Sequence, residues 1–198
     1  MSKKKKPVPL PVLENTAALV DTHCHLDMID DGLYADMVID RAQAAGVSAV
    51  ITIGIDLPSS KTAVAFAHDY EGVYASVGIH PHHARDLTDE TLAELEGLAR
   101  DKRVVGFGEI GIDTVKDYAP LAVQQSAFIR QLQLTKELGL PVVIHNREAH
   151  EQIYELLVEY GPFPAAGVIH CFSGDGITAK QFIDLGFYIS IPGVVTFN

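Results

Sequence analysis

The sequence predicts an α/β fold, a (βα)8 barrel of parallel strands that here stops after the seventh strand. Three observations predict this fold. Short apolar segments recur along the 198 residues, a segment with helical periodicity follows almost every one of them, and seven of the nine histidines come directly after an apolar segment. Successive apolar segments are mostly spaced by roughly 25 to 35 residues, as expected for parallel strands joined by helical crossovers.

Seven apolar segments are predicted as strands. Most are continuously apolar rather than alternating with polar residues, which indicates burial on both faces of a parallel sheet covered by helices. The predicted strands lie near Leu19 and at residues 47–53, 73–79, 104–110, 140–144, 166–169 and 187–191.

Six segments between the predicted strands are expected to form helices. Their apolar residues recur with helical spacing, at residues 34–45, 60–70, 89–100, 121–138, 148–160 and 178–185. Four of them are followed by a glycine before the next strand, and glycine favours the end of a helix. These glycines are Gly46, Gly72, Gly139 and Gly186.

Two sheet topologies fit alternating strands and helices: an open doubly wound sheet and a closed barrel. An open sheet gathers its ligand at one switch point, so only some strand ends carry chemistry. Here the first, third, fourth, fifth and sixth predicted strands all end in histidine or glutamate, and such a ring of contributors favours the barrel. An eighth strand with its helices needs about 50 to 60 more residues, so we expect the sequence to be a fragment.

Composition and charge describe one globular domain, which we place at residues 17–198. The hydrophobic content is 47% and the charged content 21%. The formal net charge of −11 argues against a wide basic groove for long nucleic acid, because such grooves neutralise many phosphates.

The first 16 residues are lysine-rich and then proline-rich, and they are predicted to be a disordered tail. A weak electrostatic anchor for nucleic acid or anionic lipid is the alternative. The basic start lacks the apolar helix of a signal peptide, and no apolar run is long enough to cross a membrane. Two cysteines do not suggest a disulfide framework. We expect a cytoplasmic protein with no membrane attachment and no obligate protein partner.

His23 and His25 are candidate ligands of a metal ion. In an extended strand these two side chains point to one side and Cys24 points to the other. Two converging imidazoles suit one metal, whereas the alternative is a pair of hydrogen-bonded loop residues. Cys24 is interpreted as a small packed hydrophobic residue.

Glu109 lies among glycines in residues 106–113, where ligands can approach the backbone closely. Its carboxylate can bridge two cations, and His145 and His170 would complete a second metal position with it. Taken singly, Glu109 could be a loop acid and the two histidines ordinary core residues. Two metals a few ångströms apart can activate a water and hold a phosphate during in-line displacement.

Further candidates lie around these ligands. Arg147 would face the same way as His145, and its guanidinium suits a phosphate; a surface ion pair with Glu148 or Asp175 is the alternative. His80 and His82 could contact phosphate or donate a proton, and a structural role is nearly as good an interpretation. Asp27 and Asp113 are expected to orient histidines or cap turns. Three histidines are interpreted as structural or exposed: His68, His83 and His150.

Five motifs, in this order, resemble the TatD-type deoxyribonuclease family of metal-dependent hydrolases. They are D-T-H-C-H-L-D at residues 21–27, G-I-H-P-H at 78–82, G-E-I-G-I-D at 108–113, I-H-N-R at 144–147 and I-H-C-F-S-G at 169–174. The resemblance covers nearly everything from residue 19 to residue 198.

The resemblance implies a TIM barrel that binds two divalent ions and hydrolyses phosphodiester bonds of DNA, commonly as an exonuclease. One ion would be held by His23, His25 and Glu109, and the other by Glu109, His145 and His170. Glu109, His82 and Arg147 are the candidate catalytic residues. The ions could be Mg²⁺, Mn²⁺ or Zn²⁺, because such sites accept each of them. The acidic composition suggests that the chain binds the ends of its DNA substrate, and we expect that DNA to be single-stranded.

Two departures from the family pattern bear on function. The family usually has an aromatic residue after the position of Asp113, whereas Thr114 and Val115 follow it here. The family also carries a metal-binding aspartate at the end of its eighth strand, which this sequence does not reach. We therefore expect the 198-residue chain alone to be impaired.

Two other functions remain open. An amidohydrolase acting on C–N bonds shares the H-x-H barrel arrangement, but many of those enzymes bridge their metals with a carbamylated lysine where this chain has Glu109. A non-catalytic metal-binding fragment is the third possibility.

Overall fold

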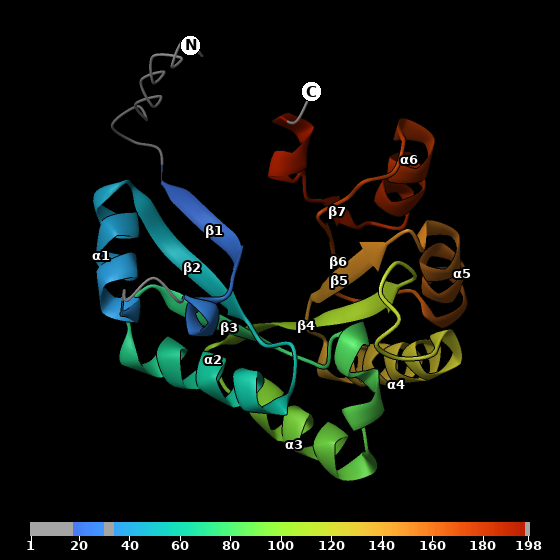
Figure 1. The fold of residues 1–198 in the computed structure, drawn as a ribbon, viewed down its shortest axis with the longest axis horizontal. Helices are drawn as coiled ribbons and strands as arrows, with labels where there is room; N and C mark the ends of the chain where they lie inside the picture. The colour runs from blue at the N-terminus through green and yellow to red at the C-terminus, as the bar shows by residue number, and fades with distance from the viewer. Residues whose placement is uncertain (1–17, 30–33, 197–198) are drawn as a thin grey trace, which may run out of the picture.

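Seven parallel strands form one curved sheet, in the order β1-β2-β3-β4-β5-β6-β7 along the sequence. The computed structural model describes residues 18–29 and 34–196. The helices lie on the outer side of the curve, and β1 and β7 flank its opening (Figure 1). Within the described residues β1 and β7 do not pair with each other. The predicted architecture, a (βα)8 barrel open after its seventh strand, is confirmed. The predicted disordered tail at residues 1–16 lies outside the described residues.

The strands and helices alternate from the first to the last. The strands are β1 (Leu19–Cys24), β2 (Val47–Ile53), β3 (Val73–Val77), β4 (Val104–Asp113), β5 (Val142–Arg147), β6 (Gly167–His170) and β7 (Tyr188–Ile189). The α-helices are α1 (Ala35–Ala44), α2 (Leu57–Asp69), α3 (Asp89–Ala99), α4 (Leu121–Leu138), α5 (His150–Tyr160) and α6 (Gly176–Asp184). The described residues also form three short 3-10 helices: η1 (Leu26–Met28), η2 (Pro81–Asp86) and η3 (Gly193–Thr196).

Local sequence signals explain most element boundaries. Gly139 ends α4 in the left-handed conformation, with φ of 68°, which glycine adopts without a steric penalty. Helix α2 begins three residues before its predicted start, because Asp56 caps it by accepting a hydrogen bond from the backbone N–H of Ser59. Helix α5 begins two residues after its predicted start, because Glu148 has a φ of 51° and lies outside the helical region.

The core lies between the middle strands and the helices outside them. Strands β3, β4 and β5 are almost completely buried, and Phe107 and Ile144 are fully covered. Burial on both faces was also predicted for the first and last strands, and there the prediction is wrong. Leu19 is 44% exposed and Tyr188 is 77% exposed. Both strands have a neighbour on one side only among the described residues, so one edge of each remains uncovered.

Among the described helices, none is both long and apolar enough to cross a membrane. The cytoplasmic location stays a prediction.

Candidate metal centre

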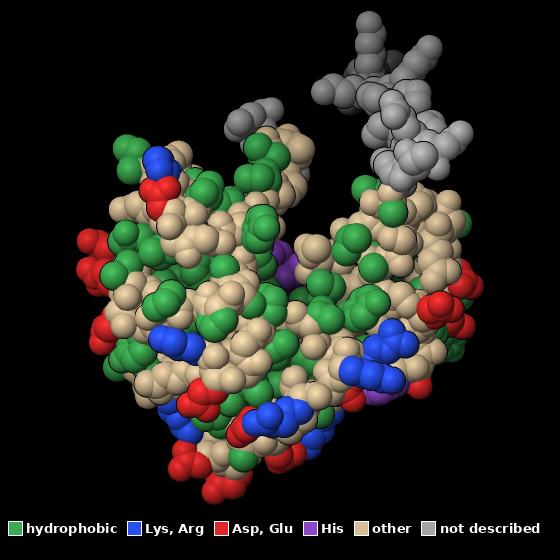
Figure 2. Space-filling model, turned by 180° about the vertical axis from the view of Figure 1, so that it is seen from behind, with side chains coloured by type: hydrophobic (Ala, Val, Ile, Leu, Met, Phe, Trp, Pro, Cys, Tyr) green, Lys and Arg blue, Asp and Glu red, His purple; other side chains and the backbone are tan. Residues whose placement is uncertain are grey.

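The candidate ligands converge on the inner side of the curved sheet, at the carboxyl ends of its strands. His23 lies in β1 and His25 directly after it, while Glu109, His145 and His170 lie in β4, β5 and β6. Strand pairing places His145 beside His170 in register. Figure 2 shows histidine side chains at the bottom of the hollow between the two ends of the sheet. Residues far apart in the sequence therefore meet where a barrel holds its active site.

Glu109 lies between two histidines and contacts each with a different oxygen. Its Oε1 is 2.9 Å from Nδ1 of His145, and its Oε2 is 3.4 Å from Nε2 of His23. Burial acts to raise the pKa of Glu109, but the hydrogen bonds from His145 and His23 outweigh it and hold the pKa well below its usual range. The carboxylate is therefore ionised, with its two oxygens directed toward separate imidazoles.

His170 joins the His23 side of this arrangement. The rings of His23 and His170 are stacked, with centroids 3.5 Å apart and planes 9° apart. His23, Glu109 and His170 each offer a ligand atom within 4.8 Å of the other two. Burial, with the charge of His23, lowers the pKa of His170 to about 4, so its imidazole is neutral near pH 7 and able to bind a metal. The prediction grouped His170 with His145, and in the structure its ring lies on His23.

His25 is oriented by the backbone of the neighbouring strand. Its Nδ1 lies 3.2 Å from the carbonyl oxygen of Ile53, and donation to that oxygen leaves Nε2 free as a ligand atom. The rings of His23 and His25 are 5.2 Å apart. Cys24 points to the other side of β1, with its Sγ 3.5 Å from the carbonyl oxygen of Ile51. Burial raises the pKa of this thiol to about 12, which matches an inert packed side chain.

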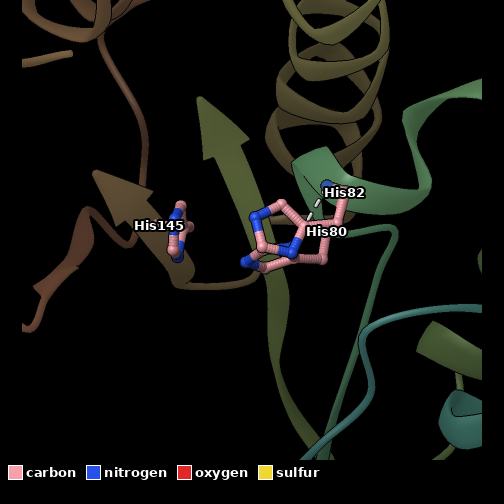
Figure 3. Close-up of side chains that lie close together, drawn as sticks. All are labelled: His80, His82 and His145. Carbon is pink, nitrogen blue, oxygen red and sulfur yellow. Dashed lines mark hydrogen bonds between the residues drawn. The ribbon is translucent and has the colours of Figure 1, made fainter. Parts of the chain in front are cut away.

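A second histidine group lies beside the first. His80 and His82 come from the segment after β3 and approach His145 on β5 (Figure 3). The backbone N–H of His82 donates to Nδ1 of His80 at 3.2 Å, and the rings of His80 and His145 are 4.2 Å apart. Burial and the charge of His145 lower the pKa of His80 to about 3. His80 is thus a neutral imidazole inside the site.

Asp113 links His82 to His145 within the second histidine group. Its Oδ2 is 2.8 Å from Nε2 of His82 and 3.2 Å from Nε2 of His145. Its Oδ1 accepts the backbone N–H groups of Val115 and Lys116, each at 2.9 Å. Burial acts to raise the pKa of Asp113, but these hydrogen bonds lower it to about 2. Asp113 both orients histidines and caps a turn, as the sequence predicts. Because Nε2 of His145 faces Asp113, Nδ1 is the nitrogen directed toward Glu109.

Two buried glutamines on α4, neither of them predicted as part of the site, fix the backbone that carries these residues. Gln131 accepts the N–H of Ile79 at 2.8 Å and donates to its carbonyl oxygen at 3.0 Å, next to His80. Gln124 makes the same pair of contacts with the backbone of Asp113, at 2.9 and 3.1 Å. Their spacing of seven residues puts them on one helix face. A glutamine on the apolar face of this predicted helix was the available signal.

Arg147 and Tyr118 lie at the outer rim of the site. The guanidinium of Arg147 is half exposed and lies 4.0 Å from Oδ2 of Asp113. Neither alternative ion pair, with Glu148 or with Asp175, forms in the described part of the chain. The ring of Tyr118 lies 4.6 Å from that of His82, and nothing in the sequence analysis pointed to this tyrosine.

The three histidines interpreted as structural or exposed lie outside these groups. His68 pairs with Asp101 at 2.7 Å and His83 lies 3.7 Å from Asp86, both near the surface. The ring of His150 contacts Phe172.

The donor set fits a divalent cation. It combines imidazoles with an ionised buried carboxylate, the groups that bind Zn²⁺ and Mn²⁺ in proteins. Nδ1 of His23 is buried and has no hydrogen-bond partner among the described residues, which is costly unless a ligand or water satisfies it.

The chain is similar to known metal-dependent hydrolases. The family model described as TatD related DNase matches residues 20–198. An uncharacterized metal-dependent hydrolase of Bacillus subtilis, YabD, is 37% identical over 180 residues, which cover 91% of this chain and 71% of the relative. The 3'-5' ssDNA/RNA exonuclease TatD of Cronobacter sakazakii is 41% identical over 160 residues, which cover 81% of this chain and 61% of the relative.

Solved structures give the same result. The crystal structure of YjjV, a TatD homolog from Escherichia coli, matches with a TM-score of 0.78 and 33% identity, over 86% of this chain and 66% of that one. A TatD family hydrolase from Entamoeba histolytica, at 24% identity, shares the fold with a TM-score of 0.79. The chain thus spans about two thirds of the length of these relatives. From its motifs, fold and matched residues, this chain belongs to the TatD family of metal-dependent hydrolases.

Proposed function

We propose that this chain binds two divalent cations around Glu109 and hydrolyses phosphodiester bonds at the ends of single-stranded DNA. The observation that carries the proposal is the Glu109 carboxylate, which directs one oxygen toward His145 and the other toward His23. A carboxylate placed in this way can serve two cations at once. The relatives named as 3'-5' ssDNA/RNA exonucleases support a nucleic acid as the substrate.

In this proposal each oxygen of the Glu109 carboxylate belongs to a different metal position, and each position has its own histidines. His23 and His25 would hold one cation with Glu109, and His145 and His170 would hold the other. The stacking of His170 on His23 also allows His170 to share the first cation. When bound, paired divalent cations lower the pKa of a water and neutralise charge on a phosphate.

Residues of the second histidine group would act on the substrate. His82 is held at Nε2 by Asp113 and is partly exposed, so its other nitrogen is available to a phosphate oxygen or to the leaving group. Arg147 offers a half-exposed guanidinium, whose fork of N–H donors matches two phosphate oxygens. His80, buried and neutral, would hold the His82 segment in place through the bond between its Nδ1 and the N–H of His82.

The test compares a variant of Glu109, the proposed bridging residue, with a matched control. Glu109→Gln keeps the shape of the side chain but removes its charge, while Glu94→Gln changes an exposed glutamate on α3 that pairs with Lys61. Outer residues around a metal contribute 10- to 100-fold to affinity or activity, so loss of a direct ligand is expected to cost at least about 100-fold. The measurements are calorimetric Mn²⁺ titration and cleavage of end-labelled single-stranded DNA. Glu94→Gln is expected to match the unaltered chain in both.

Two outcomes would contradict the proposal. Equal DNA cleavage by Glu109→Gln and the unaltered chain would identify a contaminating nuclease. Mn²⁺ binding that depends on Glu109, with no cleavage of DNA, would describe a metal-binding protein that lacks nuclease activity.

A further inference from the structure

We propose that Tyr118 is a stacking platform for an unpaired nucleobase at the rim of the site, and that it gives the chain its preference for single-stranded ends. This inference rests on the proposed function, since it requires a nucleic acid at the histidine groups. It assigns to Tyr118 the binding of a base, while Arg147 and His82 contact phosphate.

The exposure of the ring is the first observation. Tyr118 is 60% exposed, and its ring lies 4.6 Å from the ring of His82 with 53° between their planes. It is therefore an aromatic group held beside a residue of the substrate site, with most of its surface open to solvent. Aromatic surfaces of this kind bind the faces of bases.

The loop that carries Tyr118 is tied down near its start. The N–H groups of Val115 and Lys116 donate to Oδ1 of Asp113, and the Oγ1 of Thr114 donates to the carbonyl oxygen of Glu148 at 2.7 Å. At the other side, Gln124 donates to the carbonyl oxygen of Ala119 at 2.8 Å. Five or fewer residues separate these anchors from one another, so the backbone that carries the ring is largely fixed before a strand binds.

The charge of the chain is the third observation. With a net charge of −11, the chain cannot gain most of its affinity by neutralising many phosphates along a groove. Stacking does not depend on charge, and every base has a face on which it can occur. A platform of this kind tolerates any sequence but needs a base without a partner above it. It therefore favours a frayed or single-stranded end over a paired one.

The test measures binding of two oligonucleotides to four forms of the chain. Both oligonucleotides are fluorescent, single-stranded and phosphorothioate-linked to slow cleavage, and one lacks bases in its two terminal nucleotides at each end. The proteins are the unaltered chain, Tyr118→Ala, Tyr118→Phe and the control Tyr188→Ala. Tyr188 is also exposed, at 77% against 60% for Tyr118, and among the described residues its ring contacts no histidine ring. Fluorescence anisotropy in Mn²⁺ gives the dissociation constants.

Tyr118→Ala is expected to bind the complete oligonucleotide about 5- to 150-fold more weakly, the range that stacking of one base supplies. The same variant should bind the abasic oligonucleotide as the unaltered chain does. Tyr118→Phe and Tyr188→Ala should leave both constants unchanged, and matching thermal melting curves check that each variant folds.

Several results would overturn the inference. Tyr118→Ala could bind the complete oligonucleotide as tightly as the unaltered chain does, or lose affinity for both oligonucleotides equally. Tyr118→Phe could lose as much affinity as Tyr118→Ala, which would assign the effect to the hydroxyl group. If the unaltered chain binds neither oligonucleotide, the proposed function fails together with the inference. If it binds both without any dependence on Tyr118, the inference fails alone.

Discussion

The middle of the sheet and its two ends differ in how well they are covered. Strands β3, β4 and β5 are buried between helices and neighbouring strands, whereas β1 and β7 expose large apolar residues. The site draws on both regions: Glu109, Asp113 and His145 belong to the middle, and His23 to an end strand. The residues from the middle strands are therefore held by packing of the core, whereas the His23 ring is held by its contacts with Glu109 and His170.

The largest expected effect is on the free energy of unfolding. Isoleucine-to-alanine substitutions at a buried and at an exposed position test the difference between the middle and the end of the sheet. Ile144→Ala removes a fully buried side chain from β5, and we expect the free energy of unfolding to fall by about 2–5 kcal/mol. Ile191→Ala changes a side chain that is 68% exposed just after β7, and we expect a change within about 0.5 kcal/mol. Urea unfolding measures both values. Equal losses would contradict the contrast.

Metal binding should stabilise the end strand more than the middle. At a concentration 100 times the dissociation constant, Mn²⁺ is expected to raise the free energy of unfolding by about 2.7 kcal/mol for each cation. The His23 ring is held by its contacts with Glu109 and His170, which a bound cation would strengthen. Hydrogen exchange of β1 should therefore slow more than that of β4. Exchange followed by mass spectrometry, with and without Mn²⁺, checks this. Uniform slowing of all strands would count against it.

Replacement of either buried glutamine on α4 should lower the stability of the fold. Gln131→Leu and Gln124→Leu each leave backbone groups unsatisfied inside the fold, at an expected cost of about 1–3 kcal/mol. Gln133→Leu, at an exposed position of the same helix, is the control and should change stability by less than about 0.5 kcal/mol. Thermal unfolding gives the three values, and a control as destabilised as the others would refute the assigned role.

The smallest expected effect, counted for one pH unit, is on the pH dependence of the stability of the metal-free chain. The pKa of His80 is about 3 in the folded chain and near 6.5 when unfolded, so between these values the unfolded chain binds the extra proton. Stability is therefore present above pH 6.5 and is lost as the pH falls toward 3. His80→Gln should flatten this loss by at most about 1.4 kcal/mol per pH unit, the effect of one proton. An unchanged slope in urea titrations at several pH values would contradict it.

The sequence predicted the fold well because its signals are local. Continuous apolar segments and terminal glycines such as Gly139 mark where strands and helices lie. The exposure of β1 was not predicted, because apolar composition does not tell whether a strand has a neighbour on both sides. The capping of α2 by Asp56 was available in the sequence and was overlooked.

The site was predicted in outline because strand ends share one edge of the sheet. That rule places His145 and His170 near Glu109, but it does not fix ring orientations. The stacking of His170 on His23 depends on the curvature of the sheet, which no local pattern encodes. Tyr118 was missed for the same reason, since its approach to His82 depends on how the loop after β4 folds back.

The bridging role of Glu109 is tested most directly by electron paramagnetic resonance of the Mn²⁺-loaded chain. If one carboxylate joins two cations, the spectrum will show a spin-coupled manganese pair at two ions per chain, and Glu109→Gln will lose the coupling. A spectrum of isolated Mn²⁺ in the unaltered chain, or an unchanged coupled spectrum in the variant, would contradict the account.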